Sequence, residues 1–318
     1  MKAALLYGAR MLEVSEIPRP RLPRGWALVR SELAGICGTD KAFYTGSYRL
    51  FKTPLVPGHE VVGVVEEGPE ELVGVRVVSE INFSCMTCDY CRLGMYTHCP
   101  HKVTLGIDFD GGMAEFFAAP SWALHRFDLE PQLGIFVEPL AAVLRAFKLS
   151  PVKPGDRVAV VGAGNIALLT VQVLKHQGVS VDLIARRSSR KAGYFRDIVD
   201  SIVYTDEVVE SSYDVVFETS GDPEALNIAI KAAKPLGVIH LKSTPGSSAH
   251  INATWAVVKE LKIVGSRCGT FREFREAIRL LKVGAVKPRL DKVYGIDDAK
   301  EAFEASLDPS YFKIAIRP

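Results

Sequence analysis

The stretch VAVVGAGNIALLTVQVL, residues 158–174, begins with four apolar residues, continues through two glycines and ends in a second apolar run. It is about as long as a membrane-spanning helix, which needs ~17–25 residues. However, Asn165, Thr170 and Gln172 interrupt its apolar character, and the glycines separate its two halves. The first half has the length of a buried strand, and the second half has helical spacing. We therefore predict a strand over residues 158–161, a glycine turn and a helix.

The glycine turn follows the pattern G-x-G-x-x-A at Gly162, Gly164 and Ala167. Alone, this pattern is a weak signal, but between a strand and a helix it is typical of a dinucleotide-binding site. The glycines let the backbone approach a pyrophosphate, and the amino end of the helix attracts its negative charge. We predict that the cofactor is contacted at this turn by Gly162, Gly164, Asn165 and Ile166.

The next predicted strand, VSVDLIA over residues 179–185, indicates which dinucleotide is preferred. NAD-binding strands of this kind end in an acidic residue that holds the ribose 2′-hydroxyl. Here Asp182 lies inside the strand, and Arg186 and Arg187 follow its end. The basic run is either a solvated loop, as most charge runs are, or a binding site for the 2′-phosphate of NADP. We predict NADP(H), with NAD(H) as the alternative.

Further segments of the carboxyl-terminal half alternate between strand and helix patterns. Strands that alternate with helices predict a doubly wound parallel sheet, so the expected fold class is α/β. Such sheets bind ligands at the carboxyl ends of their strands, where Thr219 lies, and we predict that Thr219 contacts the cofactor. The strand patterns are YDVVFETSG (213–221), VIHLKSTPG (238–246) and LKIVGSRCG (261–269), and the helical pattern is PEALNIAIKAAK (223–234).

Four of the six cysteines lie within residues 85–99, with the spacing C-x2-C-x2-C-x7-C. Two pairs of thiolates around one point suit a tetrahedral Zn²⁺ ion. The alternatives are free thiols and an iron–sulfur cluster, whose bacterial ferredoxin motif ends in C-x3-C-P rather than C-x7-C-P. Because four protein ligands fill the coordination shell of zinc, we predict a structural rather than a catalytic site. Its ligands would be Cys85, Cys88, Cys91 and Cys99.

A second potential metal site is spread along the chain. Cys37 lies in AGICGTD, His59 in PGHE and Glu138 in VEPLAA. Each alone has a simpler explanation, namely a buried thiol, a hydrogen-bonded loop histidine and the start of a helix. Together they make a three-ligand zinc site with one open position, as catalytic zinc requires. Asp40 and Glu60 stand beside these residues, where groups that orient metal ligands are usually found.

Composition narrows the class of protein. The chain has 318 residues, 48% of them hydrophobic, and a net charge of +2. Its length suggests two domains, and its even charge balance argues against a nucleic-acid partner. No targeting or lipidation signal is visible, so we expect a cytoplasmic protein without membrane association. Asparagine and glutamine together number only seven, a scarcity that is typical of thermophile proteins.

The ordered set of motifs resembles the zinc-containing medium-chain alcohol dehydrogenase family. The set comprises GICGTD, PGHEVVG, the four-cysteine segment, GGMAEF, VEPLA, VGAGNIALL and the ending DDAKEAF…FKIAIRP, so the resemblance covers nearly the whole chain. It implies a GroES-like, mostly-β catalytic domain over residues 1–147, with a structural zinc lobe at about residues 80–105. A Rossmann NADP-binding domain would follow over residues 148–267, and residues 268–318 would return to the catalytic domain.

The resemblance also implies roles for single residues. Cys37, His59 and Glu138 would hold the catalytic zinc, and Glu60 would stand behind them or bind the metal transiently. The hydroxyl of Thr39 would take the proton of the substrate. The four clustered cysteines match the structural zinc lobe of the family. The expected cofactors are therefore two zinc ions per chain and NADP(H).

Other features of the resemblance concern the cofactor, the substrate and the assembly. Lys313 matches a basic residue near the cofactor pyrophosphate. Many relatives carry a proton-releasing histidine where this chain has Ala42, so the proton route beyond the first hydroxyl differs. Phe43, Tyr48 and Phe109 are candidates to line the substrate pocket. Because relatives are dimers and tetramers, a homo-oligomer is expected.

A glutamate as third zinc ligand is similar to the polyol, sugar and threonine dehydrogenases. The implied reaction transfers a hydride between NADP(H) and a secondary alcohol, polyol or sugar hydroxyl, or the matching carbonyl. One alternative is a zinc-independent quinone or enoyl reductase of the same fold, against which the three potential ligands speak. The other is a non-catalytic NADP-binding zinc protein, which would bind the cofactor and turn over no alcohol.

Overall fold

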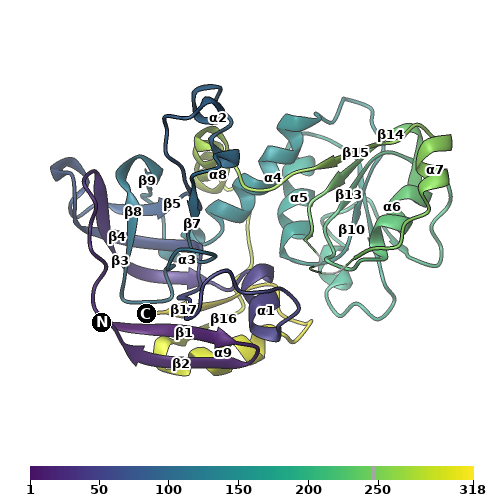
Figure 1. Cartoon of the computed structure of the whole chain (residues 1–318). Coiled ribbons are helices and arrows are strands. Elements are labelled where there is room, and N and C mark those ends of the chain that lie inside the picture. The colour runs from purple at the N-terminus through teal and green to yellow at the C-terminus, as the bar shows by residue number, and fades with distance from the viewer. Residues whose placement is uncertain (245, 247) are drawn as a thin grey trace. The chain divides into compact units, whose positions relative to one another are not determined.

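The computed structural model describes residues 1–244, 246 and 248–318, and the chain forms two compact units (Figure 1). The predicted domain bounds remain a prediction, because a compact unit and a functional domain need not end at the same residue. Residues 142–147 and 280–289, for example, lie in the second unit. The first unit comprises Met1–Ala141, Cys268–Arg279 and Leu290–Pro318, and the second comprises Ala142–Arg267 and Leu280–Arg289.

The second unit is built on a six-stranded sheet in which every neighbouring pair is parallel. The strand order is β12-β11-β10-β13-β14-β15, so the chain first builds outward from β10 and then returns to β13 on its other side. This is the predicted doubly wound order, and such sheets bind ligands outside the carboxyl ends of the strands at which the order reverses, here β10 and β13. The strands are β10 (Val158–Val161), β11 (Val181–Ala185), β12 (Ser201–Tyr204), β13 (Tyr213–Glu218), β14 (Ala233–Leu241) and β15 (Lys262–Gly265).

Helices cover both faces of this sheet, with α5 and α6 on opposite sides (Figure 1). The predicted strand and helix at residues 158–174 are confirmed as β10 and α5, and all four residues of β10 are buried. Burial by helices on both faces explains why this strand is continuously apolar. Among the residues that the structure describes, no helix is long and apolar enough to cross a membrane. The helices are α5 (Asn165–His176), η4 (Ala192–Phe195), α6 (Ala225–Ala232) and α7 (Ala253–Val258).

The first unit is mostly β, as predicted. Its main sheet has the order β16-β17-β3-β4-β5-β9, and β8 pairs with the other end of β3. The pair β3 and β4 is antiparallel, and β17 from the end of the chain pairs with β3. The strands are β1 (Lys2–Gly8), β2 (Met11–Glu16), β3 (Trp26–Gly35), β4 (Glu60–Glu67), β5 (Arg76–Ser79), β6 (Asn82–Phe83), β7 (Val103–Thr104), β8 (Phe116–Pro120), β9 (Leu124–Arg126), β16 (Lys292–Gly295) and β17 (Ile314–Arg317).

Short helices join the strands of the first unit and pack on a core that includes Phe43, Phe117 and Phe303. The segment VEPLAAVLRAFKL forms helix α4, and both α4 and α8 begin in the first unit and end in the second. The helices are η1 (Glu70–Leu72), α1 (Gly38–Thr45), α2 (Asp89–Arg92), η2 (Tyr96–His98), η3 (Ser121–Ala123), α3 (Pro131–Gly134), α4 (Val137–Leu149), α8 (Phe271–Lys282), η5 (Ile296–Asp298) and α9 (Ala299–Ser306).

Candidate functional site

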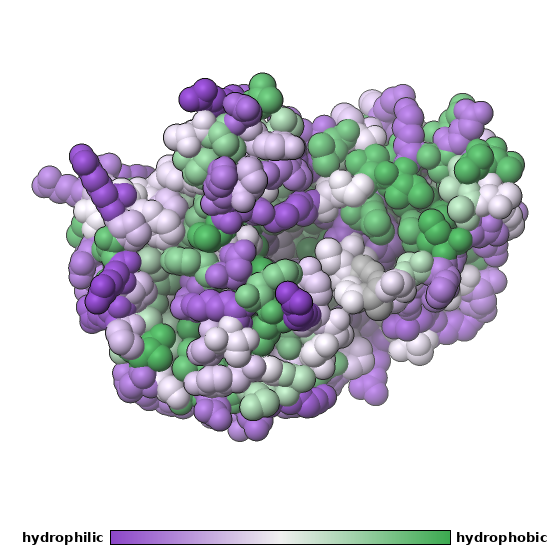
Figure 2. Space-filling view, viewed as in Figure 1, coloured by the Kyte–Doolittle hydropathy of each residue, from purple (hydrophilic) through white to green (hydrophobic). Residues whose placement is uncertain are grey.

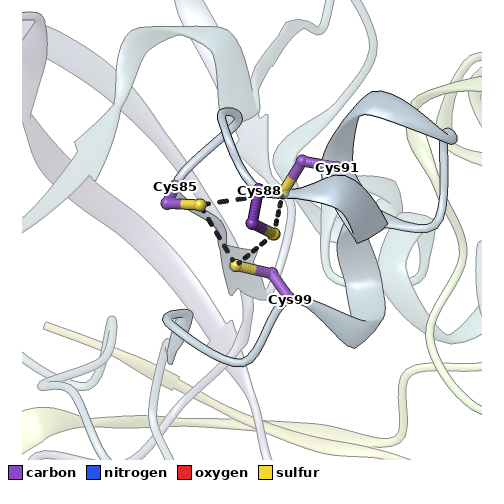
Figure 3. A group of neighbouring side chains, drawn as sticks. All are labelled: Cys85, Cys88, Cys91 and Cys99. Atoms are coloured by element: carbon purple, nitrogen blue, oxygen red, sulfur yellow. Dashed lines mark hydrogen bonds between the residues drawn. The ribbon is translucent and has the colours of Figure 1, made fainter.

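The four clustered cysteines converge on one point in a small lobe around α2 and η2 (Figure 3). Cys88 precedes α2, Cys91 lies within it, and Cys99 follows η2. The Sγ–Sγ distances are 3.5 Å between Cys88 and Cys91, 3.7 Å between Cys88 and Cys99, and 3.5 Å between Cys99 and Cys85. The fourth distance, between Cys85 and Cys91, is 4.0 Å. The structure therefore brings all four predicted ligands together.

These sulfur positions fit a single four-coordinate ion. A tetrahedral ion with metal–sulfur bonds of ~2.3 Å separates its sulfurs by about 3.8 Å, which matches the lobe. The distances are too long for disulfides. They also do not suit a 4Fe–4S cluster, in which each cysteine binds a different iron atom and the cysteine sulfurs stand further apart. The Thr87 hydroxyl, 3.5 Å from Cys85 Sγ, lowers the pKa of this thiol to about 5, which favours the thiolate that a metal needs.

A buried polar network, which the sequence did not reveal, fixes the cysteine lobe to the main sheet. The Tyr96 hydroxyl in η2 donates to Glu80 Oε2 at 2.7 Å, and Glu80 Oε1 lies 2.9 Å from His125 Nε2 in β9. The same hydroxyl accepts a hydrogen bond from the backbone N–H of Phe271, the first residue of α8. Burial raises the pKa of Tyr96, so it stays a neutral donor. The Tyr96 hydroxyl thus connects the cysteine lobe to both the main sheet and α8.

The second candidate site lies at one end of the main sheet of the first unit. Cys37 lies two residues after the end of β3, and His59 immediately precedes Glu60, the first residue of β4. Because Gly35 of β3 pairs with Glu60 of β4, the two strands bring these side chains to the same place. The candidate ligand atoms of Cys37, His59 and Glu60 all lie within 4.8 Å of one another.

Glu138, the third predicted ligand, lies in the first turn of α4 and is buried. Its negative charge is one of the groups that raise the pKa of His59, so it stands near the histidine. In the described part of the chain, however, the tight group of potential ligands contains Glu60 and not Glu138. The structure therefore brings together Cys37, His59 and Glu60, and the ligand role of Glu138 stays a prediction.

Negative charge dominates the buried surroundings of His59. Burial alone would lower the pKa of this histidine, but the charges of Cys37 and Asp40 outweigh burial and raise it well above its ordinary value. Asp40 is fully buried, which raises the pKa of its carboxyl, and its Oδ2 accepts the backbone N–H of Cys37 at 2.8 Å. A field that holds a proton on His59 also attracts a metal dication.

Two buried polar atoms of this site lack hydrogen-bond partners among the residues that the structure describes. They are His59 Nδ1 and Asp40 Oδ1, which lie 3.9 Å apart. Unpaired buried polar atoms are costly and usually mark a functional site. A thiol, an imidazole and carboxylates are also the donors that zinc prefers. The residues present therefore fit a metal ion.

Lys313 is buried at the same site. Its ammonium group contacts the Glu60 carboxylate and donates to the carbonyl of Ile36 at 3.2 Å. Burial alone would lower the pKa of Lys313, but the charge of Glu60 outweighs burial and raises it. Lys313 was expected near a cofactor pyrophosphate, whereas the structure pairs it with Glu60. Its role toward the cofactor stays a prediction.

Thr39 lies in the first turn of α1, two positions after Cys37, and is half-buried. The expected substrate-pocket aromatics fall in two places. Phe43 of α1 is buried and stacks on Tyr48, with ring centroids 5.6 Å apart. Phe109 instead packs against Trp26, with ring centroids 5.5 Å apart, and is not part of that stack. The substrate contacts of all three aromatics stay predictions.

The predicted dinucleotide turn lies at the carboxyl end of β10, beside the end of β13, in the second unit. Gly162 has a φ of +106°, and a Cβ there would lie 2.9 Å from the Cα of Ser220, so no other residue fits. Gly164 and Ile166 are half-buried on either side of Asn165, whose Oδ1 is buried without a partner in the described residues. An unpaired acceptor beside an open helix end fits a bound dinucleotide.

Thr219, at the end of β13, uses its hydroxyl within the sheet. Its Oγ1 donates to the carbonyl of Val161 at 2.8 Å, so it joins β13 to β10 at the dinucleotide turn. Its direct contact with a cofactor stays a prediction. Asp182 accepts hydrogen bonds from Tyr213 and Ser201, both at 2.9 Å. These bonds hold Asp182 inside the sheet, away from the strand end where an NAD-binding carboxylate would stand.

The two arginines after β11 differ in their surroundings. The Arg186 side chain is 72% exposed, and its nearest charged partner, Asp222, is 3.6 Å away. Arg187 donates to Asp206 at 2.9 Å and to Glu207. The guanidinium of Arg187 also lies over the ring of Tyr204, 4.4 Å from its centroid. Of the two arginines predicted to bind the phosphate, Arg187 is already held by two carboxylates, whereas Arg186 has only the longer contact with Asp222.

Comparison with known proteins agrees with this geometry. Residues 23–128 match the alcohol dehydrogenase GroES-like domain, and residues 165–283 match the zinc-binding dehydrogenase domain. The predicted combination of a GroES-like domain and a Rossmann domain is therefore confirmed.

The chain is also similar to individual proteins over its whole length. It is 31% identical to an alcohol dehydrogenase of Geobacillus stearothermophilus, over 96% of both chains. It is 29% identical to a sorbitol dehydrogenase of Halalkalibacterium halodurans, over 98% of this chain and 97% of that one.

Two solved structures carry a bound cofactor. A putative zinc-binding dehydrogenase of Sinorhizobium meliloti bound to NADP has a TM-score of 0.89 and 28% identity, over 100% of this chain and 99% of that one. An Escherichia coli protein described as a short chain alcohol dehydrogenase, complexed with NADH, has a TM-score of 0.90 and 25% identity over the same shares. The sequence, the two cysteine-containing sites and the fold lead to one assignment: the chain belongs to the zinc-containing medium-chain alcohol dehydrogenase family.

Proposed function

We propose that this protein is a zinc-dependent oxidoreductase that transfers a hydride between NADP(H) and a secondary alcohol, a polyol or a sugar hydroxyl. The observation that carries the proposal is the buried group of Cys37, His59 and Glu60, whose negative surroundings favour a cation. The same chain has the dinucleotide turn at Gly162. Relatives named alcohol dehydrogenase and sorbitol dehydrogenase support an alcohol or polyol as substrate.

We assign the catalytic metal to Cys37, His59 and Glu138. Glu60 lies closer to the first two residues, but its carboxylate is already paired with Lys313. Glu138 then supplies the second negative charge, which with the Cys37 thiolate balances a dication. Zinc, when bound, supplies a Lewis acid that lowers the pKa of an alcohol hydroxyl. A second zinc in the cysteine lobe would be structural, which gives two ions per chain.

The side chain of Thr39 is our candidate for the first proton acceptor. It follows Cys37 by two positions and is half-buried at the start of α1. Ala42, one turn further along the helix, has no group that can carry the proton onward, so we assign the route only as far as Thr39. Replacement of Thr39 by alanine should lower kcat about 10²–10⁴-fold, the usual contribution of a positioned proton acceptor. A full rate across the pH range in Thr39→Ala would remove this role.

NADP(H) is our proposed cofactor because of Arg186. Similar structures hold NADP in one case and NADH in the other, so the preference depends on the residues of this chain. A guanidinium-to-phosphate hydrogen bond contributes about 1.5–3 kcal/mol, and Arg186 is exposed and weakly paired. Arg187 would first have to leave Asp206 and Glu207, so we expect it to contribute less.

One observation and one experiment separate this proposal from its alternatives. A zinc-independent quinone or enoyl reductase has no need of a buried thiol, imidazole and carboxylate in one place, as at Cys37, His59 and Glu60. A non-catalytic NADP-binding zinc protein would share both metal sites and the dinucleotide turn. Only an assay of turnover distinguishes this last alternative.

The decisive experiment combines metal analysis with a substrate screen. Protein purified without chelator should contain close to two zinc ions per chain and no stoichiometric iron. Secondary alcohols, polyols and aldoses are then offered with NADP⁺ and with NAD⁺, and reduction of the nicotinamide is followed by absorbance. We expect turnover of at least one substrate with NADP⁺. A single zinc, a brown iron-containing protein, or cofactor binding without any turnover would contradict the proposal.

We also propose that the protein is a cytoplasmic homo-oligomer that assembles through β15. This strand is the edge of the parallel sheet, and exposed edges readily pair with a second copy. Near it, Val257 and Val258 of α7 are 74% and 76% exposed, and Figure 2 shows hydrophobic residues gathered on this part of the second unit. Light scattering after size-exclusion chromatography should give a mass of at least two chains, and a monomer would contradict the assignment.

A further inference from the structure

A loop that contains Phe109 and the first residues of the GGMAEF motif holds the chain segment that ends at His59. The loop comprises residues 105–113, LGIDFDGGM, and we name it the clamp loop. Backbone N–H groups near its end donate to three consecutive carbonyls that precede His59. The bonds run from Gly111 to Val56 at 2.7 Å, from Met113 to Pro57 at 3.0 Å and from Gly112 to Gly58 at 2.7 Å.

A side chain of the clamp loop strengthens this attachment. Asp110 Oδ1 accepts the backbone N–H of Val56 at 3.1 Å, and Oδ2 accepts the ammonium group of Lys52. One carboxylate thus connects the clamp loop to both ends of the segment that leads to the PGHE motif. Asp110 does not belong to either group of potential metal ligands, and its contacts with Val56 and Lys52 serve to attach the clamp loop.

The clamp loop lies against the His59 segment too closely for side chains. A Cβ on Gly111 would lie 2.5 Å from the carbonyl oxygen of Gly58, although the backbone of Gly111 is not in the left-handed region. A Cβ on Gly106, whose φ is +69°, would lie 2.9 Å from the nitrogen of Gly58 and 3.1 Å from that of His59. Real Cβ atoms do not approach backbone this closely, so any side chain here displaces the segment.

This backbone contact matters because the imidazole of His59 extends from the segment that the clamp loop holds. Its Nδ1 makes no hydrogen bond within the described ranges, and Asp40 Oδ1 stands 3.9 Å away, beyond hydrogen-bond distance. A histidine ligand normally owes its orientation to a hydrogen bond on its second nitrogen. Asp40, whose charge already attracts this imidazole, is the side chain that can supply such a bond, and the clamp loop fixes the backbone from which the imidazole extends.

We propose that the clamp loop is the positioning element of the second metal site, and that Gly106, Asp110 and Gly111 are positioning residues for His59. The inference rests on the proposed function, because it assumes that His59 binds the catalytic metal. Metal sites tolerate displacements of only about 0.5 Å in their ligands. A Cβ on Gly111, 2.5 Å from the carbonyl oxygen of Gly58, must recede by about 0.9 Å to reach an ordinary contact of 3.4 Å. A shift of the segment by that amount exceeds the tolerance and weakens metal binding without removing a ligand.

The variants that test this inference have room to fold. Val56, Asp110 and Gly111 line a cavity of about 240 Å³ in the first unit, into which the clamp loop can retreat when a methyl group is added. We therefore expect Gly111→Ala to fold with a displaced segment. Gly106→Ala adds the strain of a left-handed backbone to the same contact, so it is the more severe variant.

The experiment measures metal release, with the cysteine lobe as an internal reference. Wild type, Gly111→Ala and Gly106→Ala are loaded with zinc, and the release of each ion to a chromogenic chelator is followed in time. In both variants one ion should leave about 10–100-fold faster, the usual effect of disturbing a residue that orients a ligand, while the lobe ion leaves at the wild-type rate. Cobalt-loaded protein gives a second readout, because the spectrum of the Cys37–His59 site should change and the sulfur bands of the lobe should not.

Matched variants keep the inference open to refutation. Gly74→Ala has nearly the same left-handed strain as Gly106→Ala, with a φ of +76°, but its Cβ meets no described atom within 4 Å. It should release both ions at the wild-type rate. Asp110→Asn, which adds no atom, should accelerate the same ion as Gly111→Ala by a smaller factor, and it serves if the glycine variants do not fold.

The possible outcomes separate the two proposals. A wild type that binds only the lobe ion would overturn the proposed function. A wild type that binds two ions, with wild-type release from both Gly111→Ala and Asp110→Asn, would overturn the role of the clamp loop alone. Equal acceleration by Gly74→Ala would also overturn it, because general strain would then explain the effect.

Discussion

The cysteine lobe and the Cys37–His59 site are both built for metal, but they are assembled in opposite ways. The lobe takes its four ligands from residues 85–99, a segment that contains the short helices α2 and η2. The second site takes its ligands from the end of β3, the start of β4 and, in our assignment, α4. The lobe is a short local segment that its ion would hold together. The second site lies at strand ends whose arrangement is fixed by the sheet and does not depend on an ion.

This difference predicts what each ion does for the protein. The lobe has a very small core of its own, made of Cys91, Tyr96 and Cys99 with Trp122 against them. Metal binding to such a segment is coupled to its folding. His59 and Glu60, by contrast, are held by a sheet with a large hydrophobic core. Loss of the first ion should therefore cost stability, and loss of the second should cost activity.

The largest effect that we expect concerns the lobe. Cys88→Ser should reduce the zinc content by one ion and lower the free energy of unfolding by more than about 4 kcal/mol, as the loss of a structural metal does. Denaturant unfolding combined with zinc analysis measures both. Cys268→Ser is the matched control, because Cys268 is half-buried and belongs to neither group. If Cys88→Ser lacks one zinc ion but keeps the wild-type free energy of unfolding, the lobe ion does not stabilise the protein and the proposed difference between the two sites is wrong.

A slightly smaller effect should appear at the second site. Glu138→Gln should lower kcat/KM by about 10³-fold, since a Lewis acid contributes several kcal/mol to the transition state. Unfolding and NADPH binding should change little. Glu60→Gln is the matched variant and separates the two carboxylates. If Glu60→Gln loses the second zinc and Glu138→Gln retains it, Glu60 is the ligand and our assignment is wrong.

An intermediate effect tests how the lobe is attached to the sheet. Tyr96→Phe removes a donor from the buried carboxylate of Glu80 and an acceptor from the N–H of Phe271. Unsatisfied buried groups of this kind cost about 1–3 kcal/mol, which urea unfolding can measure. Both zinc ions should remain. Tyr90→Phe, at an exposed position of α2, should change nothing, and a similar loss in that variant would argue against the network.

The smallest effect extends the comparison to the second unit, where two adjacent arginines differ in their partners. Arg186→Ala should reduce the preference for NADP⁺ over NAD⁺ about tenfold, which corresponds to the low end of one charge-assisted hydrogen bond. Arg187→Ala should have a weaker effect because Asp206 and Glu207 already hold Arg187. The measurement is kcat/KM with both cofactors. Equal or better use of NAD⁺ by the wild type would contradict the assigned preference.

The parts of the molecule that the sequence predicted are those whose signals are local. The strand at Val158–Val161 and the turn at Gly162 are determined by residues within a few positions of each other, so the sequence pattern is enough to predict them. The cysteine lobe is legible for the same reason, because its ligands are separated by fixed short spacings. Hydrophobic periodicity and residue spacing predict local secondary structure, and they do not predict contacts between distant segments.

The parts that the sequence did not predict depend on residues that are distant in the chain. The pairing of Lys313 with Glu60 and the contact of Tyr96 with Phe271 each join segments that no spacing rule connects. The sequence placed Glu138 in the ligand set by its residue type and by resemblance, and Glu60 only beside that set, whereas the structure groups Glu60 with Cys37 and His59. It also treated Arg187 as available, since Asp206 approaches it only through the pairing of β11 with β12.

The pairing of β17 with β3 has a consequence for the order in which the protein is made. Ala315 pairs with Gly35, about 280 residues earlier, and the N–H of Ile36 donates to the carbonyl of Ile314 at 2.9 Å. At 5–20 residues per second, a ribosome makes these partners roughly 14–56 s after Gly35. The lobe has all its ligands once Cys99 emerges, so it can bind metal during translation. The end of β3 beside Cys37 lacks its partner until β17 has been made, so we expect the metal of this site to bind later than that of the lobe.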